Sequence, residues 1–333
     1  MAFLERGLGE TILWPPKNGF PQKTPLLSHV RRIHVPSRRS QEMLELIRSH
    51  KKLASNVSNG MLMKIDAPAE KVAKMRLFGT TAKLVEGLDM PAVMISPKEI
   101  RAEDAALIHL HGGAYVTGGL LQCRALISPI CAEAGIRALT FSYRLAPEHP
   151  YPAQLEDAYR AYRYLRYAGY PAKKIGLVGE SAGGNLALAL VLRLRDEGEE
   201  LPGAMALMSP WVDLAQTGES YRTLKDVDAT LDADELLQSA IAFAGSEERL
   251  ESPEISPLYA DYHGLPPTLI HCGTSEILLS DSEKLEENML CDGVDAHLVR
   301  WEGMCHVFQA FGFEESKAAN HQLGAFLYDR LKG

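Results

Sequence analysis

Short apolar runs of about five residues recur along the chain, and amphipathic segments separate the later ones. Runs of this length are typical of strands, and the segments between them have the spacing of helices. Such alternation indicates an α/β fold, with a mostly parallel eight-stranded sheet and helices on both faces. The eight predicted strands are Met75–Gly79, Ala92–Ser96, Ala105–Leu110, Arg137–Phe141, Lys174–Gly179, Ala204–Ser209, Thr268–Cys272 and Ala296–Arg300.

Two stretches do not follow this alternation, and we expect them to form a helical cap over the functional site. The first includes the helical segment Gln41–Leu53, and the second carries a helix start near Asp232. The predicted organisation is an N-terminal cap segment at 1–70, the first part of an α/β core at 71–210, a second cap segment at 211–260 and the C-terminal part of the core at 261–333.

The pentapeptide Gly179-Glu180-Ser181-Ala182-Gly183 follows a predicted strand and precedes an apolar helix. A serine in so tight a strand-to-helix turn adopts a strained backbone conformation that exposes its hydroxyl at the top of the sheet. The glycines let strand and helix approach without a Cβ clash, and the N–H of Ala182 is left pointing at a reacting carbonyl. Ser181 is therefore the predicted nucleophile.

An earlier loop has the composition of an oxyanion site. The predicted strand Ala105–Leu110 leads into His111-Gly112-Gly113-Ala114-Tyr115, where two glycines leave the backbone N–H groups unobstructed. A phosphate-binding loop would need a different glycine spacing, which this loop lacks. We expect Gly112 and Gly113 to donate, with Ala182, to a negatively charged oxygen, and Tyr115 is a candidate substrate contact.

The catalytic base is expected to come last in the chain, on a loop after the final strand. Of eleven histidines, only His306 satisfies this condition, because it follows the predicted strand Ala296–Arg300. The other histidines precede the first sheet strands, fall in predicted strands, helices or turns, belong to the Gly112 loop or come before the strand that carries the acid. His306 is the predicted base.

The acid that orients the base should lie between Ser181 and His306, on the loop after Thr268–Cys272. Two carboxylates compete there, Glu276 and Asp281. Asp281 also fits the first turn of the next helix, where capping and the helix dipole favour an acidic residue. Glu276 has the longer reach and the better location, so it is the preferred acid.

These motifs resemble those of hormone-sensitive-lipase-type esterases, a bacterial group of α/β-hydrolases with a His-Gly-Gly oxyanion loop. The segment Tyr143–Ala153 matches a long stretch characteristic of the group, and the resemblance covers most of the chain from about Ala105 onward. The chain departs from the common pattern at three positions. Ala114 occupies a position where many members of the group have a third Gly, and Glu180 and Glu276 occupy positions where many have Asp. Within the matching stretch, Arg144 and Glu148 are expected to form an ion pair.

The resemblance implies an α/β-hydrolase fold and a carboxylic ester hydrolase acting on short- to medium-chain acyl or aryl esters. In that mechanism Ser181 attacks the ester carbonyl, His306 transfers the proton, and Glu276 fixes the imidazole. The resemblance calls for no metal and no organic cofactor. An amidase or a lipase would use the same triad. A ligand-binding receptor is the alternative from another class, although the presence of His306 speaks against it.

Composition and charge narrow the classes of molecule that this protein is expected to bind. A formal net charge of −8 argues against nucleic acid, and no basic run with interleaved aromatic residues occurs. No run reaches the length of a membrane span, and the first residues lack the pattern of a secretory signal, so the default expectation is a cytoplasmic protein with no membrane partner. A homodimer is a further possibility from the resemblance.

The five cysteines form no Cys-x-x-Cys pair and have no zinc-like spacing to histidine, so free thiols are expected. Cys305 adjoins the predicted base, but it lacks the strained turn and the oxyanion loop that accompany Ser181. It is therefore expected to be a buried or pocket-lining thiol.

Overall fold

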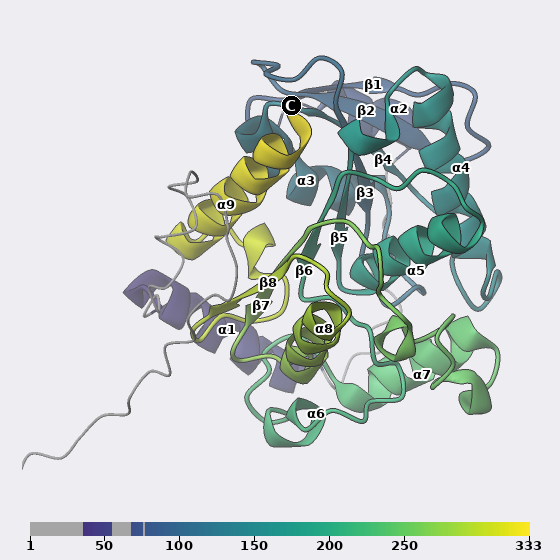
Figure 1. The fold of residues 1–333 in the computed structure, drawn as a ribbon. Helices are drawn as coiled ribbons and strands as arrows, with labels where there is room; N and C mark the ends of the chain where they lie inside the picture. Colours follow the sequence, from purple (N-terminus) through teal and green to yellow (C-terminus); the bar gives the residue numbers. More distant parts are fainter. Residues whose placement is uncertain (1–35, 55–67, 76) are drawn as a thin grey trace, which may run out of the picture. The chain divides into compact units, whose positions relative to one another are not determined.

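The computed structural model describes residues 36–54, 68–75 and 77–333, all of which fall within one unit spanning 33–333. In this described part, eight strands form one sheet in the order β1-β2-β4-β3-β5-β6-β7-β8 (Figure 1). The strands are β1 (Thr81–Leu84), β2 (Ala92–Ser96), β3 (Ala106–Leu110), β4 (Arg137–Phe141), β5 (Ile175–Glu180), β6 (Ala204–Met208), β7 (Thr268–Gly273) and β8 (Ala296–Trp301).

The strands from β3 to β8 pair in parallel, whereas β2 pairs antiparallel with both β1 and β4. Strands β3, β5, β6 and β7 are buried along their whole length, as expected where helices cover both faces of a parallel sheet. The predicted fold class is confirmed. The helices around the sheet are α2 (Ala69–Lys74), α3 (Leu120–Ala134), α4 (Ala153–Tyr167), α5 (Ala182–Asp196), α8 (Leu279–Cys291) and α9 (Glu314–Leu331).

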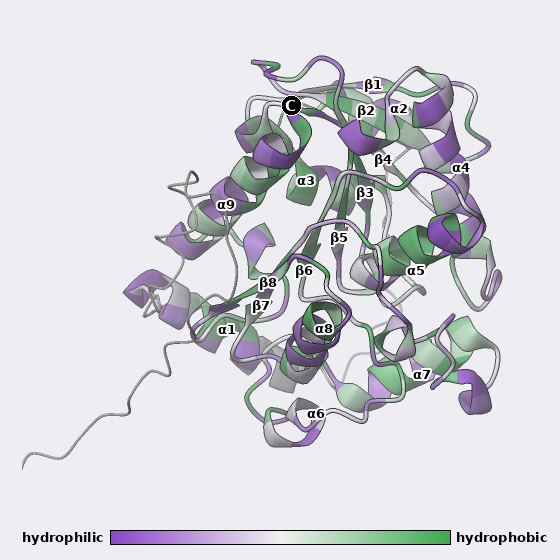
Figure 2. Ribbon diagram, in the orientation of Figure 1, coloured by the Kyte–Doolittle hydropathy of each residue, from purple (hydrophilic) through white to green (hydrophobic). Residues whose placement is uncertain are grey.

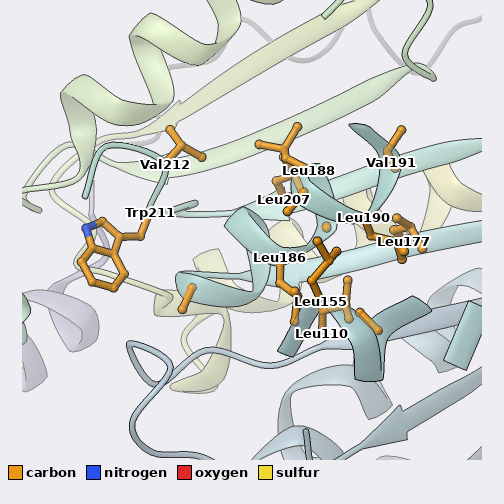
Figure 3. Close-up of a cluster of buried hydrophobic side chains, with 14 of the residues drawn as sticks. Leu110, Leu155, Leu177, Leu186, Leu188, Leu190, Val191, Leu207, Trp211 and Val212 are labelled. Atoms are coloured by element: carbon orange, nitrogen blue, oxygen red, sulfur yellow. The ribbon is translucent and has the colours of Figure 1, made fainter. Parts of the chain in front are cut away.

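Successive side chains of β3 enter two different core clusters, because strand side chains alternate between faces. Ile108 and Leu110 pack in the cluster that includes residues of α4 and α5, and Leu107 packs in the cluster that includes residues of α3 and α9. Helix α5 is coloured largely hydrophobic in Figure 2, and Figure 3 shows Leu110 in the first cluster with Leu155 and Leu186. Burial of α5 in this way fixes the direction in which the β5–α5 turn points.

The first predicted strand is wrong in position. The strand starts at Thr81, after a turn in which Leu77 and Thr80 form an isolated bridge. Phe78 and Gly79 have φ values of +49° and +71°, which an extended strand does not allow. The apolar residues at this point therefore belong to a tight turn, and the less apolar sequence after it forms the edge strand.

The two predicted cap segments contain no strand among their described residues. Helix α1 (Arg38–Ala54) covers the predicted Gln41–Leu53 helix, and its Leu44 packs with Trp301 and Phe308. Most of the rest of the 1–70 segment lies outside the described residues. The 211–260 segment contains α6 (Ser220–Thr223), α7 (Ala233–Ala244), η3 (Glu247–Arg249) and η4 (Pro257–Tyr259). Within the described ranges, no helix combines the length and the apolar character needed to cross a bilayer.

Candidate active site

Ser181 is the single residue between β5 and α5, and it has φ 55° and ψ −123°. A non-glycine residue in this region is strained by about 1–3 kcal/mol, and such strain persists only where the surroundings enforce it. Here the enforcement comes from close packing: a Cβ on Gly183 would lie 1.9 Å from the Leu110 carbonyl oxygen, and one on Gly179 would lie 2.3 Å from the Gly183 carbonyl oxygen. The turn is therefore as tight as the sequence predicts.

Glu276 and His306 meet although 30 residues separate them. Glu276 lies in the loop after β7 and His306 in the loop after β8, and these strands are neighbours in the sheet. The His306 Nδ1–H donates to Glu276 Oε2 over 2.7 Å. This hydrogen bond leaves Nε2 of His306 as the nitrogen available for proton transfer. The Glu276 side chain is fully buried, and that of His306 is 10% exposed.

The other carboxylate oxygen of Glu276 is held by three donors. Oε1 accepts from the Gly273 N–H at 2.7 Å, from the Ser209 hydroxyl at 2.7 Å and from the Cys272 thiol at 3.2 Å. Ser209 also accepts the N–H of Val307 at 3.2 Å, so one hydroxyl contacts both Glu276 and the residue after His306. This buried network orients the carboxylate toward the imidazole.

Asp281, the competing carboxylate, lies elsewhere. Its Oδ2 accepts the N–H groups of Val212 and Asp213, each at 2.9 Å, and the hydroxyl of Tyr221 at 3.2 Å. Burial raises the pKa of Asp281 well above its ordinary value, and the charge of Asp213 adds to the increase. Asp281 therefore ties α8 to the start of the 211–260 segment rather than orienting His306.

The predicted oxyanion loop lies beside Ser181, but one expected donor is already engaged. The Gly112 N–H donates to Glu180 Oε1 at 2.8 Å, which contradicts its expected role as an oxyanion donor. The next residues, Gly113 and Ala114, have φ values of +111° and +51° and line the cavity in front of Ser181. Ala182 is buried as the first residue of α5, where a helix leaves N–H groups without intrahelical partners.

Tyr115 does not contact this cavity. Its ring is fully buried and stacks on Phe243 with centroids 3.7 Å apart, and its hydroxyl donates to Asn185 Oδ1 at 2.8 Å. The expectation of a substrate contact is wrong, since Tyr115 instead joins the loop to α5 and α7. Burial also raises the pKa of Tyr115 well above its ordinary value.

Ser181 and His306 open onto a cavity of about 610 Å³. No hydrogen bond joins the Ser181 hydroxyl to His306 in the described part of the chain. Helix α7 and the residues before it supply one wall, and the loop after His306 supplies another. The apolar lining residues include Val116, Leu126, Leu231, Leu236, Val307 and Phe311.

A sequence model of the α/β-hydrolase fold family matches residues 107–310. An esterase of Acinetobacter venetianus is 36% identical over 249 residues, covering 71% of this chain and 82% of its own length. An acetyl-hydrolase of Streptomyces hygroscopicus is 39% identical over 230 residues, covering 68% and 76%. The crystal structure of an esterase from the bacterial hormone-sensitive lipase family is 34% identical, with a TM-score of 0.78 over 90% of this chain and 100% of that one. The chain belongs to the hormone-sensitive-lipase family of α/β-hydrolases.

In this α/β-hydrolase, the expected ion pair of the Tyr143–Ala153 stretch is wrong in its partner. Arg144 binds Asp157 of α4 through Nε and Nη2 at 2.8 to 3.1 Å, and its backbone N–H donates to the same carboxylate. Spacing along the chain favoured Glu148 because it is nearer in sequence. The helix places Asp157 closer in space, and its side chain is only 3% exposed.

Sequence reasoning missed two groups of buried polar residues around this site. Ser209 contacts Glu276, and His109 contacts Glu180 from the neighbouring strand with Nε2 to Oε2 at 2.8 Å. His109 gave a signal, since a histidine inside an otherwise apolar strand needs a polar partner. Ser209 gave none, because a serine at a strand end is common in loops.

One group of side chains in the described residues has the donor types of a cation site: Asp261, His263 and Asp292, whose ligand atoms lie within 4.8 Å of one another. It does not line the cavity of Ser181. His263 already binds Asp261 at 2.7 Å, and Arg195 lies 3.8 Å from the same carboxylate. Hydrogen bonding to Asp261 raises the pKa of His263, which disfavours the neutral imidazole that a metal requires.

Proposed function

We propose that this carboxylesterase cleaves short- to medium-chain acyl or aryl esters with Ser181 as nucleophile, His306 as base and Glu276 as the acid that orients it. The observation that carries the proposal is the shared cavity: Ser181 in its strained turn and His306, backed by Glu276, line the same space. Esterases and acetyl-hydrolases among the relatives support the same reaction class.

The chemistry proceeds in two halves. His306 Nε2 takes the Ser181 proton while the Ser181 Oγ bonds to the ester carbonyl carbon, and the C=O pair moves onto oxygen. The tetrahedral intermediate collapses, the C–O bond to the alcohol breaks, and His306 gives its proton to the leaving alkoxide. Water then attacks the acyl-serine with His306 again as base, which releases the carboxylic acid and regenerates Ser181.

The oxyanion donors in this proposal are the N–H groups of Gly113, Ala114 and Ala182. Gly112 is replaced by Ala114 because the Gly112 N–H is bound to Glu180. Gly113 and Ala114 line the cavity beside Ser181, and Ala182 opens α5, whose N-terminal dipole favours negative charge. Each such donor is worth about 10²- to 10³-fold in rate.

Cavity size and lining support small esters. A volume of about 610 Å³ lies within the range of pockets that enclose a drug-sized ligand. Leu236 and Phe311 give part of its wall an apolar surface suited to an acyl chain. We assign the 211–260 segment and the described helix α1 to the proposed cap, with 71–210 and 261–333 as the core. A cytoplasmic location and a homodimer stay predictions from the sequence.

The test is hydrolysis of p-nitrophenyl esters from acetate to palmitate by the wild type and by S181A. Fast turnover of the short esters that S181A abolishes is the expected result. A preference for palmitate would favour a lipase, and faster cleavage of a matched p-nitroanilide would favour an amidase. A folded wild type without turnover on any of these compounds would refute the enzyme assignment and favour the receptor alternative.

A further inference from the structure

A continuous chain of buried hydrogen bonds lies under the oxyanion loop. Thr140 Oγ1 of β4 lies 3.0 Å from His109 Nδ1, His109 Nε2 lies 2.8 Å from Glu180 Oε2, and Glu180 Oε1 accepts the Gly112 N–H at 2.8 Å. Thr140 and His109 are fully buried and Glu180 is 7% exposed. The three side chains come from neighbouring strands, since β3 pairs with both β4 and β5 and His109 is the register partner of Thr140.

These hydrogen bonds reach a loop whose backbone is strained. Gly113, Ala114 and Tyr115 follow Gly112 with φ values of +111°, +51° and +65°. Consecutive residues in the left-handed region need external contacts to stay there, above all when two of them carry a Cβ. The Glu180 carboxylate supplies the contact at the first residue of the loop's glycine pair.

A small movement of Gly112 would change the geometry at the nucleophile. A Cβ on Gly112 would lie 3.0 Å from both the Glu180 carbonyl oxygen and Ser181 Cβ, so the loop backbone packs directly against the nucleophile turn. The donors that follow Gly112 therefore depend on the position of Gly112 for their distance from Ser181, while Tyr115 holds the far end of the loop through Asn185 and Phe243. A misplacement of about 1 Å is enough to cost about 10²-fold in rate.

The length of Glu180 matters because its two oxygens face different partners. One reaches the loop N–H, and the other reaches His109 on the adjacent strand. A side chain shorter by one methylene would not span both from the same backbone position. His109 in turn satisfies the second oxygen, and without it a buried carboxylate beside the site of developing negative charge would be left half unpaired.

We propose that Glu180 and His109 form a positioning pair that fixes the oxyanion loop through the Gly112 N–H. Glu180 lines the cavity of Ser181, but in this proposal the pair acts through the Gly112 N–H and not on the reacting atoms. It acts on the rate by holding the N–H groups after Gly112 at the distance that the tetrahedral intermediate requires. The inference rests on the proposed ester hydrolysis at Ser181.

The variants E180Q and E180D test separately whether the length or the charge of the Glu180 side chain matters. Gln keeps the length of Glu, an acceptor for the Gly112 N–H and a donor that His109 Nε2 can accept when the ring proton lies on Nδ1, whereas Asp keeps the charge and loses the reach. We expect E180D to lower kcat on p-nitrophenyl acetate at least about tenfold with KM changed less than about threefold, and E180Q to stay within about threefold of wild type. A trifluoromethyl ketone forms a tetrahedral oxyanion adduct with Ser181. Its affinity for each variant should fall in parallel with the kcat of that variant.

H109F tests the second member of the pair. Phe fills the ring's space without a hydrogen bond, so kcat should fall as in E180D, and the fall should be smaller in an E180Q background, where the unpaired group is neutral. Hydrogen exchange of a peptide that contains Gly112 gives a readout independent of turnover, and it should speed up in E180D and H109F but not in E180Q.

Two results would overturn the positioning pair: wild-type kcat and wild-type exchange in both E180D and H109F, or an equal loss of kcat in E180Q and E180D. Failure of the proposed function has a different signature, which is a wild type that does not turn over the ester or an S181A variant as fast as wild type. Thermal melts of each variant show whether the fold is kept.

Discussion

The His306 Nδ1–H donates a 2.7 Å hydrogen bond to Glu276 Oε2, while Asp281, five residues farther along the chain, faces away and binds the N–H groups of Val212 and Asp213. Both carboxylates are buried. Glu276 contacts the loop of His306, whereas Asp281 contacts the start of the 211–260 segment. Substitution of Glu276 should therefore lower the rate much more than substitution of Asp281.

Loss of the Glu276 charge should disable catalysis while leaving the cavity in place. E276Q keeps the side-chain shape but favours the wrong imidazole tautomer, for which we expect kcat to fall by about 10⁴-fold. D281N keeps an oxygen for the N–H groups of residues 212 and 213, and kcat should fall less than about tenfold. Steady-state hydrolysis of p-nitrophenyl acetate measures both. An equal loss in a folded D281N would contradict the assignment of the acid.

Ser209 should matter for rate through Glu276. S209A removes the hydroxyl that donates to Glu276 Oε1 and accepts from the Val307 N–H. A hydrogen bond to a charged group is worth about 1.5–3 kcal/mol, so kcat should fall about 10- to 100-fold. The matched control is S256A, which removes another fully buried hydroxyl, one bound to the Leu214 N–H. If S256A lowers kcat as much as S209A at equal stability, the effect of S209A does not come from the acid.

Substitutions at two adjacent residues of the oxyanion loop should differ in their effects: A114G should stabilise the fold, and G113A should lower kcat. Ala114 has φ +51°, so A114G relieves a left-handed Cβ and should raise the free energy of unfolding by up to about 1 kcal/mol with kcat retained. Gly113 has φ +111°, and a Cβ there would lie 2.3 Å from the Thr117 carbonyl oxygen. G113A should therefore lower kcat by about 10²-fold or more. Urea unfolding measures the stability of A114G, and ester hydrolysis measures kcat of both variants. Wild-type kcat in G113A would count against the loop's proposed role.

His271 should make the protein sensitive to acid. Its ring is fully buried in β7 near Trp301, and burial lowers its pKa from 6.5 to about 3. Between these two values the unfolded chain binds a proton that the folded chain does not, so stability is present above pH 6.5 and is lost as pH falls. The loss approaches about 1.4 kcal/mol per pH unit for one such group.

H271L should flatten that dependence, because it removes the buried group whose pKa is lowered. Urea unfolding at pH 7.5, 6.0 and 5.0 gives the slope for each protein. Identical slopes for wild type and H271L would mean that another group causes the acid sensitivity.

The sequence by itself determined the parts of this protein that depend on local pattern. The apolar runs predicted seven of the eight strands to within one residue. Four of them, β3, β5, β6 and β7, are buried parallel strands, which must be apolar on both faces. The Ser181 turn was also predictable, because its glycines are needed wherever strand and helix pack so closely. The exception among the strands was the edge strand β1, where an exposed strand needs no apolar run and Phe78 enters a turn.

The tertiary structure decided which polar groups meet. Glu276 and Asp281 are nearly equivalent along the chain, and only the packing of the β7 and β8 loops brings one of them to His306. In the same way, Gly112 has the composition of an oxyanion donor, but its N–H is bound to Glu180. Local sequence encodes backbone conformation through sterics, whereas the partner of a buried polar group depends on contacts between strands and loops that are distant in sequence.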